Sequence, residues 1–441
     1  MDKYWNLNKL TAGSPYALYR KAIWVYLFLL IFEGALRKWF LPSLSTPLLL
    51  VRDPIAIWLT ITGYQKGWFK SGYIKTMAIV SSISLFLTII IGHHNLFVAL
   101  FGWRIYFFHF PMIFVMGKIL TREDLIKIGR FILWISIPMT VLIFVQFHSP
   151  QTAWVNTGVG GEGTAGFAGA LGYNRPPGTF SFTSGYVLYQ GVVGCLLFYF
   201  LMMNKTLPKQ YQFSQWVLII LTSCYILSIP TSISRTHFFQ TIVFITFLFI
   251  ATLRKDKMKT QFLKFTIIGI IAIFILLTLG IDENSLAAFT ERFNSANEIE
   301  GGAQNVIGNR YVGGLLGSLI NFNIPIFGYG IGLGTNVGAR AMGGNMYSFG
   351  FNAEIEWSRI IGECGMLLGL IIIGVRVFFS LELWQKAYKC LVKRFDLLPW
   401  MLSAGMILSL PQGQWGIPTN LGFCILFGGL TLAAINSSKT K

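Results

Sequence analysis

The sequence has few acidic residues and few charged residues of any kind. Only 12% of its 441 residues are Asp, Glu, Lys or Arg, whereas 54% are hydrophobic. A water-soluble domain usually carries about 25% charged residues, so the low fraction excludes an ordinary soluble enzyme and predicts an integral membrane protein. The net charge of +18 is a feature of many nucleic-acid binders. Here it comes mostly from Lys in short links between apolar segments, so we expect no nucleic-acid partner.

Patterns that bind metals or form disulfide frameworks are also missing. The five cysteines are scattered, four of them within apolar segments, and no CxxC pair occurs. The five histidines form no pair at the helical spacing that two ligands of one metal ion would need, and the sequence has no DxD motif. We therefore predict no zinc site, no disulfide framework, no other metal site and no cofactor.

Long apolar runs occupy most of the chain. A membrane-spanning helix needs about 20 apolar residues. Twelve candidate segments can be drawn, at 22–36, 44–63, 74–92, 97–116, 127–148, 179–203, 213–230, 236–253, 262–281, 354–379, 396–411 and 416–436. The second of these is interrupted by Arg52-Asp53-Pro54. The pattern predicts an all-α integral membrane protein with about 12 transmembrane helices, which form a single polytopic domain over residues 1–441.

Lys and Arg are distributed differently along the chain. Lys dominates at both ends and in one alternate set of links, at 64–73, 117–126, 204–212, 254–261 and 380–395. Arg dominates within the spans and in the links on the other side. Because Lys and Arg gather in cytoplasmic links, we predict that both termini are cytoplasmic. The polar N-terminal stretch has no cleavage signal, so the first span is expected to stay in the membrane.

Two links on the opposite, extracytoplasmic side are long. Residues 149–178 form a Gly-rich loop, and residues 282–353 form a large loop between the ninth and tenth spans. The large loop contains 14 glycines between positions 301 and 350. This density argues against a regular spanning helix and for an irregular, partly re-entrant or lid-like structure. Long ordered loops are usually functional, so we expect the working part of the protein where these loops meet the helix ends.

Five arginines outside the cytoplasmic links are candidates for binding an anion. The guanidinium group binds phosphate or carboxylate through two parallel hydrogen bonds. Arg175 precedes an outer end of a span, a position also typical of arginines that reach lipid headgroups. Arg235 lies in a very short outer link, where a positive charge opposes the usual bias. Arg104 lies within a span and needs a partner or a cavity. Arg310 and Arg340 belong to the large loop, where either is also compatible with an ordinary solvated charge.

An acidic cluster opens the tenth candidate span. Glu356, Arg359 and Glu363 are three and four residues apart, so they share one helix face and predict a structural ladder of ion pairs. Glu354 is two residues from Glu356 and points elsewhere. A carboxylate there suits a general base, and it equally suits an acid that stabilises the start of a helix. Arg292 lies among acidic residues of the large loop and is expected on the surface.

Four motifs follow one another along the chain. They are Arg175-Pro-Pro-Gly-Thr-Phe, then Ser234-Arg235-Thr236, then Asn309-Arg310-Tyr311 with the later Pro325-Ile-Phe-Gly-Tyr-Gly-Ile-Gly, and finally the helix from Glu354 that ends in Glu363-Cys-Gly-Met-Leu-Leu-Gly. With the large outer loop between spans nine and ten, these motifs make the chain resemble the O-antigen ligase and O-antigen polymerase family. The resemblance covers roughly residues 95–436.

This resemblance implies a membrane glycosyltransferase of the C type in the bacterial cytoplasmic (inner) membrane. Such enzymes act at the outer face of the membrane on glycans carried by undecaprenyl diphosphate. Family members bind the diphosphate with arginines, which implies this role for Arg175, Arg235 and Arg310. Many ligases of the family carry a His near the start of the helix after the large loop. By its spacing to Glu363, that position is Glu354 here, which favours a polymerase-like branch.

The expected function is polymerisation of lipid-linked oligosaccharide repeat units into a surface polysaccharide such as O-antigen, capsule or exopolysaccharide. The transfer would invert the anomeric centre without a metal ion. Arginines would stabilise the leaving diphosphate, and Glu354 would accept the proton of the attacking hydroxyl. The expected partners are an undecaprenyl-diphosphate-linked donor, a glycan acceptor and the lipid bilayer, with a chain-length regulator or other polysaccharide-assembly proteins beside them.

Two other functions fit parts of the sequence. An O-antigen ligase would transfer a finished glycan to lipid A-core or another acceptor by the same chemistry, and the residues do not reveal the acceptor. A transporter of lipid-linked oligosaccharide belongs to a different class. Matching halves with Gly- or Pro-broken helices would favour transport, and the sequence shows no such pairing.

Overall fold

The computed structural model describes residues 15–254, 259–263, 265–267, 269–270, 282–300, 313–318, 324–344 and 349–439. The α-helices in these ranges are α1 (Ala17–Ala35), α2 (Asp53–Gln65), α3 (Gly72–Ile90), α4 (Leu96–Arg104), α5 (Phe110–Ile119), α6 (Arg122–His148), α7 (Thr183–Met203), α8 (Gln215–Thr231), α9 (Arg235–Thr252), α11 (Glu283–Glu300), α12 (Gly313–Ser318), α13 (Asn336–Ala341), α14 (Glu356–Arg394), α15 (Leu397–Ser409) and α16 (Pro418–Lys439). The π-helical segments Leu36–Phe40 and Ile105–His109 extend α1 and join α4 to α5. The 3-10 turns are Pro42–Leu44, Pro47–Leu50, Trp154–Asn156, Asn204–Thr206 and Lys209–Tyr211. Strands β1 (Phe167–Ala170) and β2 (Tyr173–Arg175) form an antiparallel hairpin.

Eight helices in the described residues are long and apolar enough to cross a membrane. Their bounds are Gly72–Ile90, Leu96–Ile119, Arg122–His148, Thr183–Thr206, Lys209–Thr231, Arg235–Thr252, Glu356–Arg394 and Pro418–Ser438. The protein is therefore an α-helical protein with helices suited to a membrane, as its composition predicts. The count is lower than the 12 expected, because α1 contains three charged residues, and α2 and α15 are only 13 residues long. The ninth expected span, 262–281, lies largely outside the described residues.

The second expected span begins later than predicted. Residues 42–50 form 3-10 turns, and α2 starts at Asp53 with Pro54 in its first turn. Proline is favoured at this position because it lacks the amide hydrogen that a helix start leaves unpaired. The Arg52-Asp53-Pro54 interruption thus marks a helix start within the predicted segment.

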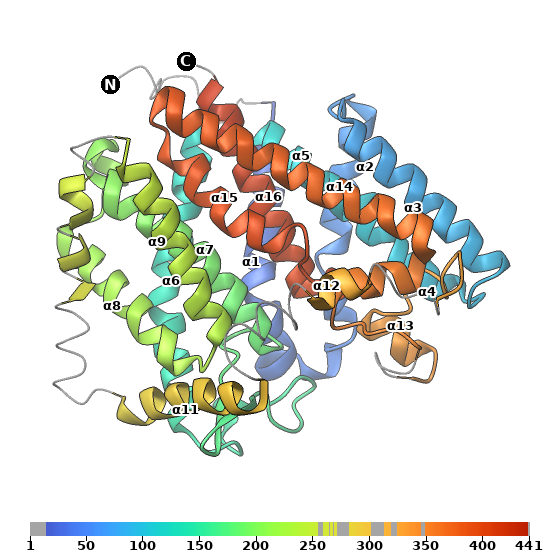
Figure 1. The fold of residues 1–441 in the computed structure, drawn as a ribbon, viewed down its shortest axis with the longest axis horizontal. Helices are drawn as coiled ribbons and strands as arrows, with labels where there is room; N and C mark the ends of the chain where they lie inside the picture. Colours follow the sequence, from blue (N-terminus) through green and yellow to red (C-terminus); the bar gives the residue numbers. More distant parts are fainter. Residues whose placement is uncertain are drawn as a thin grey trace.

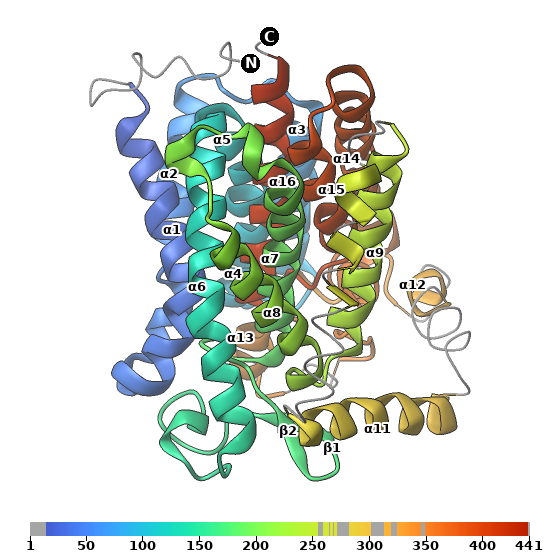
Figure 2. The same cartoon turned by 90° about the vertical axis from the view of Figure 1, so that its left-hand side faces the viewer.

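The long helices pack into one bundle around a continuous hydrophobic core. Among the eight membrane-length helices, α7 and α16 are the most enclosed, with 83% of their apolar stretches buried. Helix α16 contacts α5, α7, α14 and α15. The start of α1 and the end of α16 lie at one end of the bundle, whereas α11 and the strands lie at the other (Figures 1 and 2). Helix α11 lies across that end, roughly perpendicular to the bundle (Figure 2).

Helix α14 is broken and folds back on itself. Gly365 has φ 75° and ψ 172°, outside the helical region, so the stretch consists of a short helix from Glu356 and a long one that follows. In a straight helix, the 20 residues between Glu356 and Arg376 would separate them by about 30 Å. Instead their side chains are 2.5 Å apart. The sequence predicts one helix from residue 354 to 379, whereas the structure has two helices that meet at Gly365. Figure 1 shows the whole stretch as α14.

A loop rich in glycine fills the break in α14. We call residues 326–335 the glycine loop. The amides of Tyr329 and Gly330 donate to the carbonyl oxygens of Gly362 and Glu363, at 2.8 and 3.0 Å. These carbonyl groups have lost their helical partners at the break, and an unpaired carbonyl inside a bundle is costly. The loop therefore completes the hydrogen bonding of the broken helix.

The glycines of this loop permit close contact between backbones. Gly328, Gly330 and Gly332 all have positive φ, which residues with a side chain rarely adopt. A Cβ atom on Gly332 would collide with the Val98 carbonyl oxygen of α4, and one on Gly328 would lie 2.5 Å from the Gly365 amide nitrogen. The loop is thus clamped between α4 and α14, and its glycine spacing reflects packing.

Candidate functional site

A small hydrophobic cluster joins four segments that are far apart in the sequence. Phe147 ends α6, Ile233 lies in the link between α8 and α9, and Ala288 belongs to α11; all three are buried together. Tyr173 of β2 packs against them, and its ring stacks on Phe147 with 4.6 Å between the ring centroids. We call these four residues the satellite cluster. The satellite cluster is separate from the main core. Its contacts hold these four segments together at the α11 end of the molecule (Figure 2).

Two predicted arginines are attached to the satellite cluster. Arg175 is two residues after Tyr173, so the two side chains share one face of β2. Arg235 is two residues after Ile233 and begins α9. A Cβ atom on Gly169 would lie 2.8 Å from Ile233 Cδ1 and 3.4 Å from Arg175 Cγ. The stem of Arg175 therefore lies beside the link that carries Arg235.

A third arginine reaches the same place from α11. Arg292 is four residues after Ala288, so the two lie on the same side of the helix. The next residue, Phe293, contacts Phe238 of α9 with 5.6 Å between the ring centroids. Phe238 is three residues after Arg235, so α11 docks on the first turn of α9. We call Arg175, Arg235 and Arg292 the arginine cluster.

The charges of the arginine cluster act on one another. Burial lowers the pKa of Arg175, and the positive charges of Arg292 and Arg235 add to this effect, so that together they bring it to about 10. Its Nε atom is buried and has no hydrogen-bond partner among the described residues. Its guanidinium lies 5.9 Å from the Phe167 ring, a contact that does not neutralise charge. An anion with several oxygen atoms would relieve this repulsion and supply the missing acceptor.

The sequence identifies only part of this cluster. Arg175 and Arg235 lie near each other, whereas Arg310 lies outside the described residues. Arg292 is half-buried, not on the open surface as its acidic neighbours suggest. The signal that could have identified it is the apolar face of α11, where Ala288 and Phe289 lie one turn before Arg292 and Phe293.

Arg104 has its partners within the protein. Its Nη1 atom lies 2.9 Å from the Asp53 carboxylate, and His109 Nε2 lies 3.0 Å from the same carboxylate. All three side chains are buried. Arg104 thus belongs to a buried ion pair, and its charge is compensated without a ligand.

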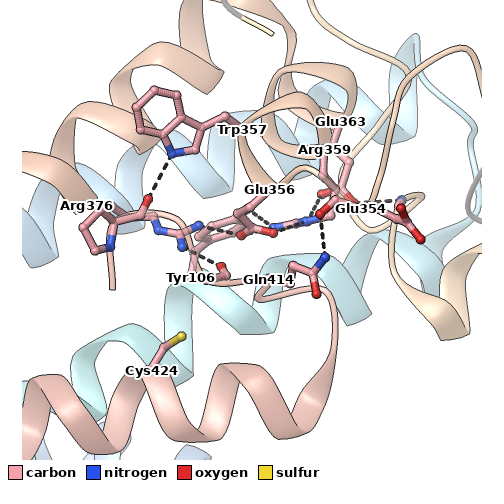
Figure 3. A network of polar contacts seen from close by, with 12 residues as sticks. Tyr106, Glu354, Glu356, Trp357, Arg359, Glu363, Arg376, Gln414 and Cys424 are labelled. Atoms are coloured by element: carbon pink, nitrogen blue, oxygen red, sulfur yellow. Dashed lines mark hydrogen bonds and ion pairs between the residues drawn. The ribbon is translucent and has the colours of Figure 1, made fainter. Parts of the chain in front are cut away.

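The other predicted site residues lie on different elements. Arg340 is exposed at the end of α13. Glu354 is exposed just before α14, and its backbone carbonyl accepts a hydrogen bond from Gln414 in the link between α15 and α16 (Figure 3). Its amide donates to the Asn352 side chain at 3.0 Å. Glu354 therefore stands at the entrance to the folded-back helix.

Four buried charges form a closed network behind Glu354. Arg359 pairs with Glu356 at 2.8 Å and with Glu363 at 2.6 Å, as a helix ladder requires. Arg376 binds Glu356 from the second half of α14. All four side chains are at most 1% exposed, and Figure 3 shows how they lie beside one another. We call these four residues the ion network.

The ion network holds the fold together. Its two positive and two negative charges cancel, so it has no excess charge to attract a ligand. Glu363 Oε1 also accepts the amide of Gly334 at 2.8 Å, which ties the glycine loop to α14. Arg359 donates to the Tyr106 hydroxyl at 3.1 Å. The network thus joins both halves of α14 to the glycine loop and to the α4–α5 segment.

Lys38 supports the segment that leads to Arg175. It lies beyond α1, is 1% exposed and donates from Nζ to the Gly178 carbonyl oxygen at 2.6 Å. Gln146 donates to the same oxygen and accepts the Gly178 amide. Gly178 has φ +62°, so this clamp fixes a turn three residues after Arg175. Burial lowers the pKa of Lys38 to about 7.

Replacing Lys38 by Met should stabilise the protein at neutral pH. The folded pKa of about 7 is below the ordinary value of 10.5, so the unfolded chain binds more protons between these values. Wild-type stability should therefore rise from pH 7 to pH 10.5, whereas Lys38→Met should lack this rise. The variant loses the hydrogen bond to Gly178 but no longer buries a charge. We therefore expect its free energy of unfolding to exceed that of the wild type by roughly 2 kcal/mol at pH 7. Thermal unfolding in detergent across this pH range measures the difference, and parallel curves would contradict it.

The arrangement suits the binding of a polyanion at the α11 end of the bundle. Arg175, Arg235 and Arg292 come from three separate segments, and the charges of the last two act on the first. A guanidinium group can bind two oxygens of a phosphate or diphosphate at once. Among the described residues, no group of three or more His, Cys, Asp or Glu side chains could hold a metal ion. No protein-family model matches the chain, and no curated protein matches it.

Proposed function

We propose that the chain is a membrane glycosyltransferase that polymerises oligosaccharide repeat units carried on undecaprenyl diphosphate. The observation that carries the proposal is the arginine cluster, which gathers three guanidinium groups at one end of a membrane-type bundle. A diphosphate carries several negatively charged oxygens. A planar guanidinium group can bind two of them at once through parallel hydrogen bonds, which an ammonium group cannot do. The product would be a surface polysaccharide such as O-antigen, capsule or exopolysaccharide.

The proposed topology puts this cluster outside the cytoplasm of a bacterial cell. This topology has twelve spans and both termini in the cytoplasm. The large loop between spans nine and ten lies on the outer face of the inner membrane. The start of α1 and the end of α16 lie at the end opposite α11, which agrees with this orientation (Figure 2). Lys gathers in the links that this topology puts in the cytoplasm.

The proposed reaction is an inverting displacement. The acceptor hydroxyl attacks the anomeric carbon of the donor, and the bond to the diphosphate oxygen breaks with its electron pair. The arginine cluster stabilises the charge that develops on the diphosphate, because fixed cations at a site of low polarity need little reorganisation. Glu354, exposed at the entrance to α14, accepts the proton of the hydroxyl. The lipid tail remains among the helices, and the bilayer and the polysaccharide-assembly proteins surround the enzyme.

Transport of a lipid-linked oligosaccharide is a weaker candidate. Broken helices inside membranes often bind substrates through their free backbone groups. In α14, however, the carbonyls of Gly362 and Glu363 already accept amides from the glycine loop. The break is thus closed by the protein itself, which favours a structural role for it. Transfer to lipid A-core or another acceptor would use the same arginine cluster, so only the product can distinguish a ligase.

The glycans of a strain that lacks the gene test this function. Loss of long chains, with single repeat units left on the lipid carrier, would support polymerisation. Long chains that persist on the carrier without reaching their acceptor would show a ligase instead. An unchanged profile of surface and lipid-linked glycans would contradict both.

Glu354→Gln tests the proposed base in the same strain. The amide keeps the shape of the side chain but cannot accept a proton, so chain formation should fall about a hundredfold. Glu283→Gln is the control, because Glu283 is an exposed acid at the start of α11. The amount of each protein in the membrane must be measured alongside. Full polymer output from Glu354→Gln would remove Glu354 from the mechanism.

A further inference from the structure

A histidine and an aspartate form a pair beside the arginine cluster. His148 ends α6, and its Nε2 lies 2.9 Å from Oδ1 of Asp282, which precedes α11. Thr231 Oγ1 donates to the second oxygen, Oδ2, at 2.9 Å. The Asp282 side chain is 1% exposed, whereas the His148 side chain is 33% exposed. The carboxylate is therefore held inside, and the imidazole faces outward from it.

The pair lies on the same segments as the arginine cluster. Phe147, the neighbour of His148, stacks on Tyr173 in the satellite cluster, two residues before Arg175. Thr231, which holds Asp282, is four residues before Arg235 at the end of the adjoining helix. Asp282 precedes the helix that carries the third arginine. All the segments that position the arginines thus also position the His148–Asp282 pair.

The geometry gives His148 a defined chemical capacity. Asp282 accepts a hydrogen bond from the Nε2–H group, so the ring is held in one orientation. Nδ1 is left for contact with a ligand, since the hydrogen bond to Asp282 uses Nε2. An imidazole can give up a proton near neutral pH, which a guanidinium cannot do. His148 therefore adds a group that can transfer a proton beside the arginine cluster, which itself supplies only fixed charge.

We propose that His148, oriented by Asp282, is the proton donor to the leaving diphosphate. This inference rests on the proposed glycosyl transfer. As the bond between the anomeric carbon and the diphosphate oxygen breaks, its electron pair remains on the diphosphate. The proton on His148 Nδ1 passes to a diphosphate oxygen, and His148 becomes neutral. Solvent reprotonates the ring after the product has left.

Protonation matters for release as well as for bond cleavage. Three guanidinium groups hold a fully ionised diphosphate strongly, because each close charge pair at a partly buried site adds to the attraction. A proton lowers the charge of the leaving group and weakens this grip. The donor acts on the leaving group, whereas Glu354 acts on the attacking hydroxyl, so the two residues perform opposite halves of one transfer.

The structural alternative is that the pair only anchors α11. Asp282 Oδ1 accepts the Ser285 amide at 3.3 Å, and its position resembles a cap of the helix. A residue that only anchors α11 needs the hydrogen bond between Asp282 and His148, but it does not need a proton that His148 can release. His148→Gln keeps an amide that can donate to Asp282, whereas it removes the titratable ring. The two roles thus give different results for this variant.

The test uses purified protein in lipid nanodiscs and the lipid-linked repeat units that accumulate in the strain without the gene. We expect His148→Ala and His148→Gln to lower kcat about a hundredfold with little change in KM. Added imidazole should restore at least a tenth of wild-type turnover to His148→Ala. Asp282→Asn should lower kcat less, because the ring remains. His94→Gln, a change at an exposed histidine of another outer link, should leave kcat unchanged.

Three results would overturn the proton-donor role. They are normal turnover in His148→Gln, a loss in His148→Ala that imidazole does not repair, and a loss that follows a fall in the thermal midpoint of the variant. Turnover of the lipid-linked repeat units by the wild type serves as the control, because it tests the proposed function independently of the role of His148. Absence of transfer by the wild type, with undecaprenyl diphosphate still unbound at high concentration, would overturn the proposed function itself.

Discussion

Arg235→Lys should lower glycosyl transfer by roughly 10² to 10³ while the protein still inserts into the membrane. Lysine keeps the positive charge but loses the planar fork that binds two oxygens at once. The residue begins α9 beside Arg175, whose pKa the Arg235 charge helps to lower. In the proposed site both residues bind the same anion, so Arg175→Lys should have an effect of similar size. Turnover of the lipid-linked repeat units in nanodiscs measures both variants.

The matched control lies at the other end of the same helix. Arg254 follows α9 on the proposed cytoplasmic side, where it is exposed and contacts the Tyr388 hydroxyl. Arg254→Lys makes the same chemical change far from the arginine cluster, so turnover should stay at the wild-type level. If Arg235→Lys also keeps normal turnover, the charge serves topology alone and the diphosphate binds elsewhere. A double variant of Arg175 and Arg235 should lose less than the product of the two single losses, because both act on one ligand.

Glu356→Gln should destabilise the protein by about 3–5 kcal/mol. Glu356 is fully buried and binds Arg359 and Arg376 at once. The amide would leave two buried guanidinium groups with Glu363 as their single remaining carboxylate, so one positive charge would stay uncompensated away from water. The midpoint of thermal unfolding in detergent should fall sharply, and the change should persist in high salt because the pair is buried.

Glu382→Gln provides the comparison on the same helix. Glu382 pairs with Lys386, but its side chain is 39% exposed, and exposed pairs contribute about 0–1 kcal/mol. The midpoint of thermal unfolding of Glu382→Gln should therefore stay close to that of the wild type. An equal, small shift for Glu356→Gln would mean that water reaches the ion network and that the network is not what holds α14 in its folded-back shape.

Local sequence patterns predict the elements of this fold. Long apolar runs predict the membrane-length helices, and the three- and four-residue spacing of Glu356, Arg359 and Glu363 predicts their common face. These features depend on residues within one or two helical turns of each other. The start of α2 was misplaced because an apolar run of the right length conceals a helix start at Asp53.

Contacts between distant segments were not predictable from the same patterns. Arg376 completes the ion network from 20 residues away, and only the break at Gly365 brings it there. Arg292 and Arg175 meet because the satellite cluster joins β2 to α11. A single sequence gives no signal for such pairings, since they depend on how helices and loops pack. Arg175 and Arg235 were therefore predictable as candidate residues, whereas Arg292 and the grouping of the three arginines were not.

The folded-back shape of α14 also constrains the order in which the protein can be assembled. As one straight helix, its 39 residues would be about 58 Å long, well beyond the roughly 30 Å hydrocarbon core of a bilayer. The glycine loop that satisfies its break leaves the ribosome earlier, and two other helices that this loop contacts, α3 and α4, earlier still. When α14 is synthesised, the loop that completes its break has therefore already been made. Helix α14, in the last third of the chain, thus packs against a loop that contacts α3 and α4, which are in the first third.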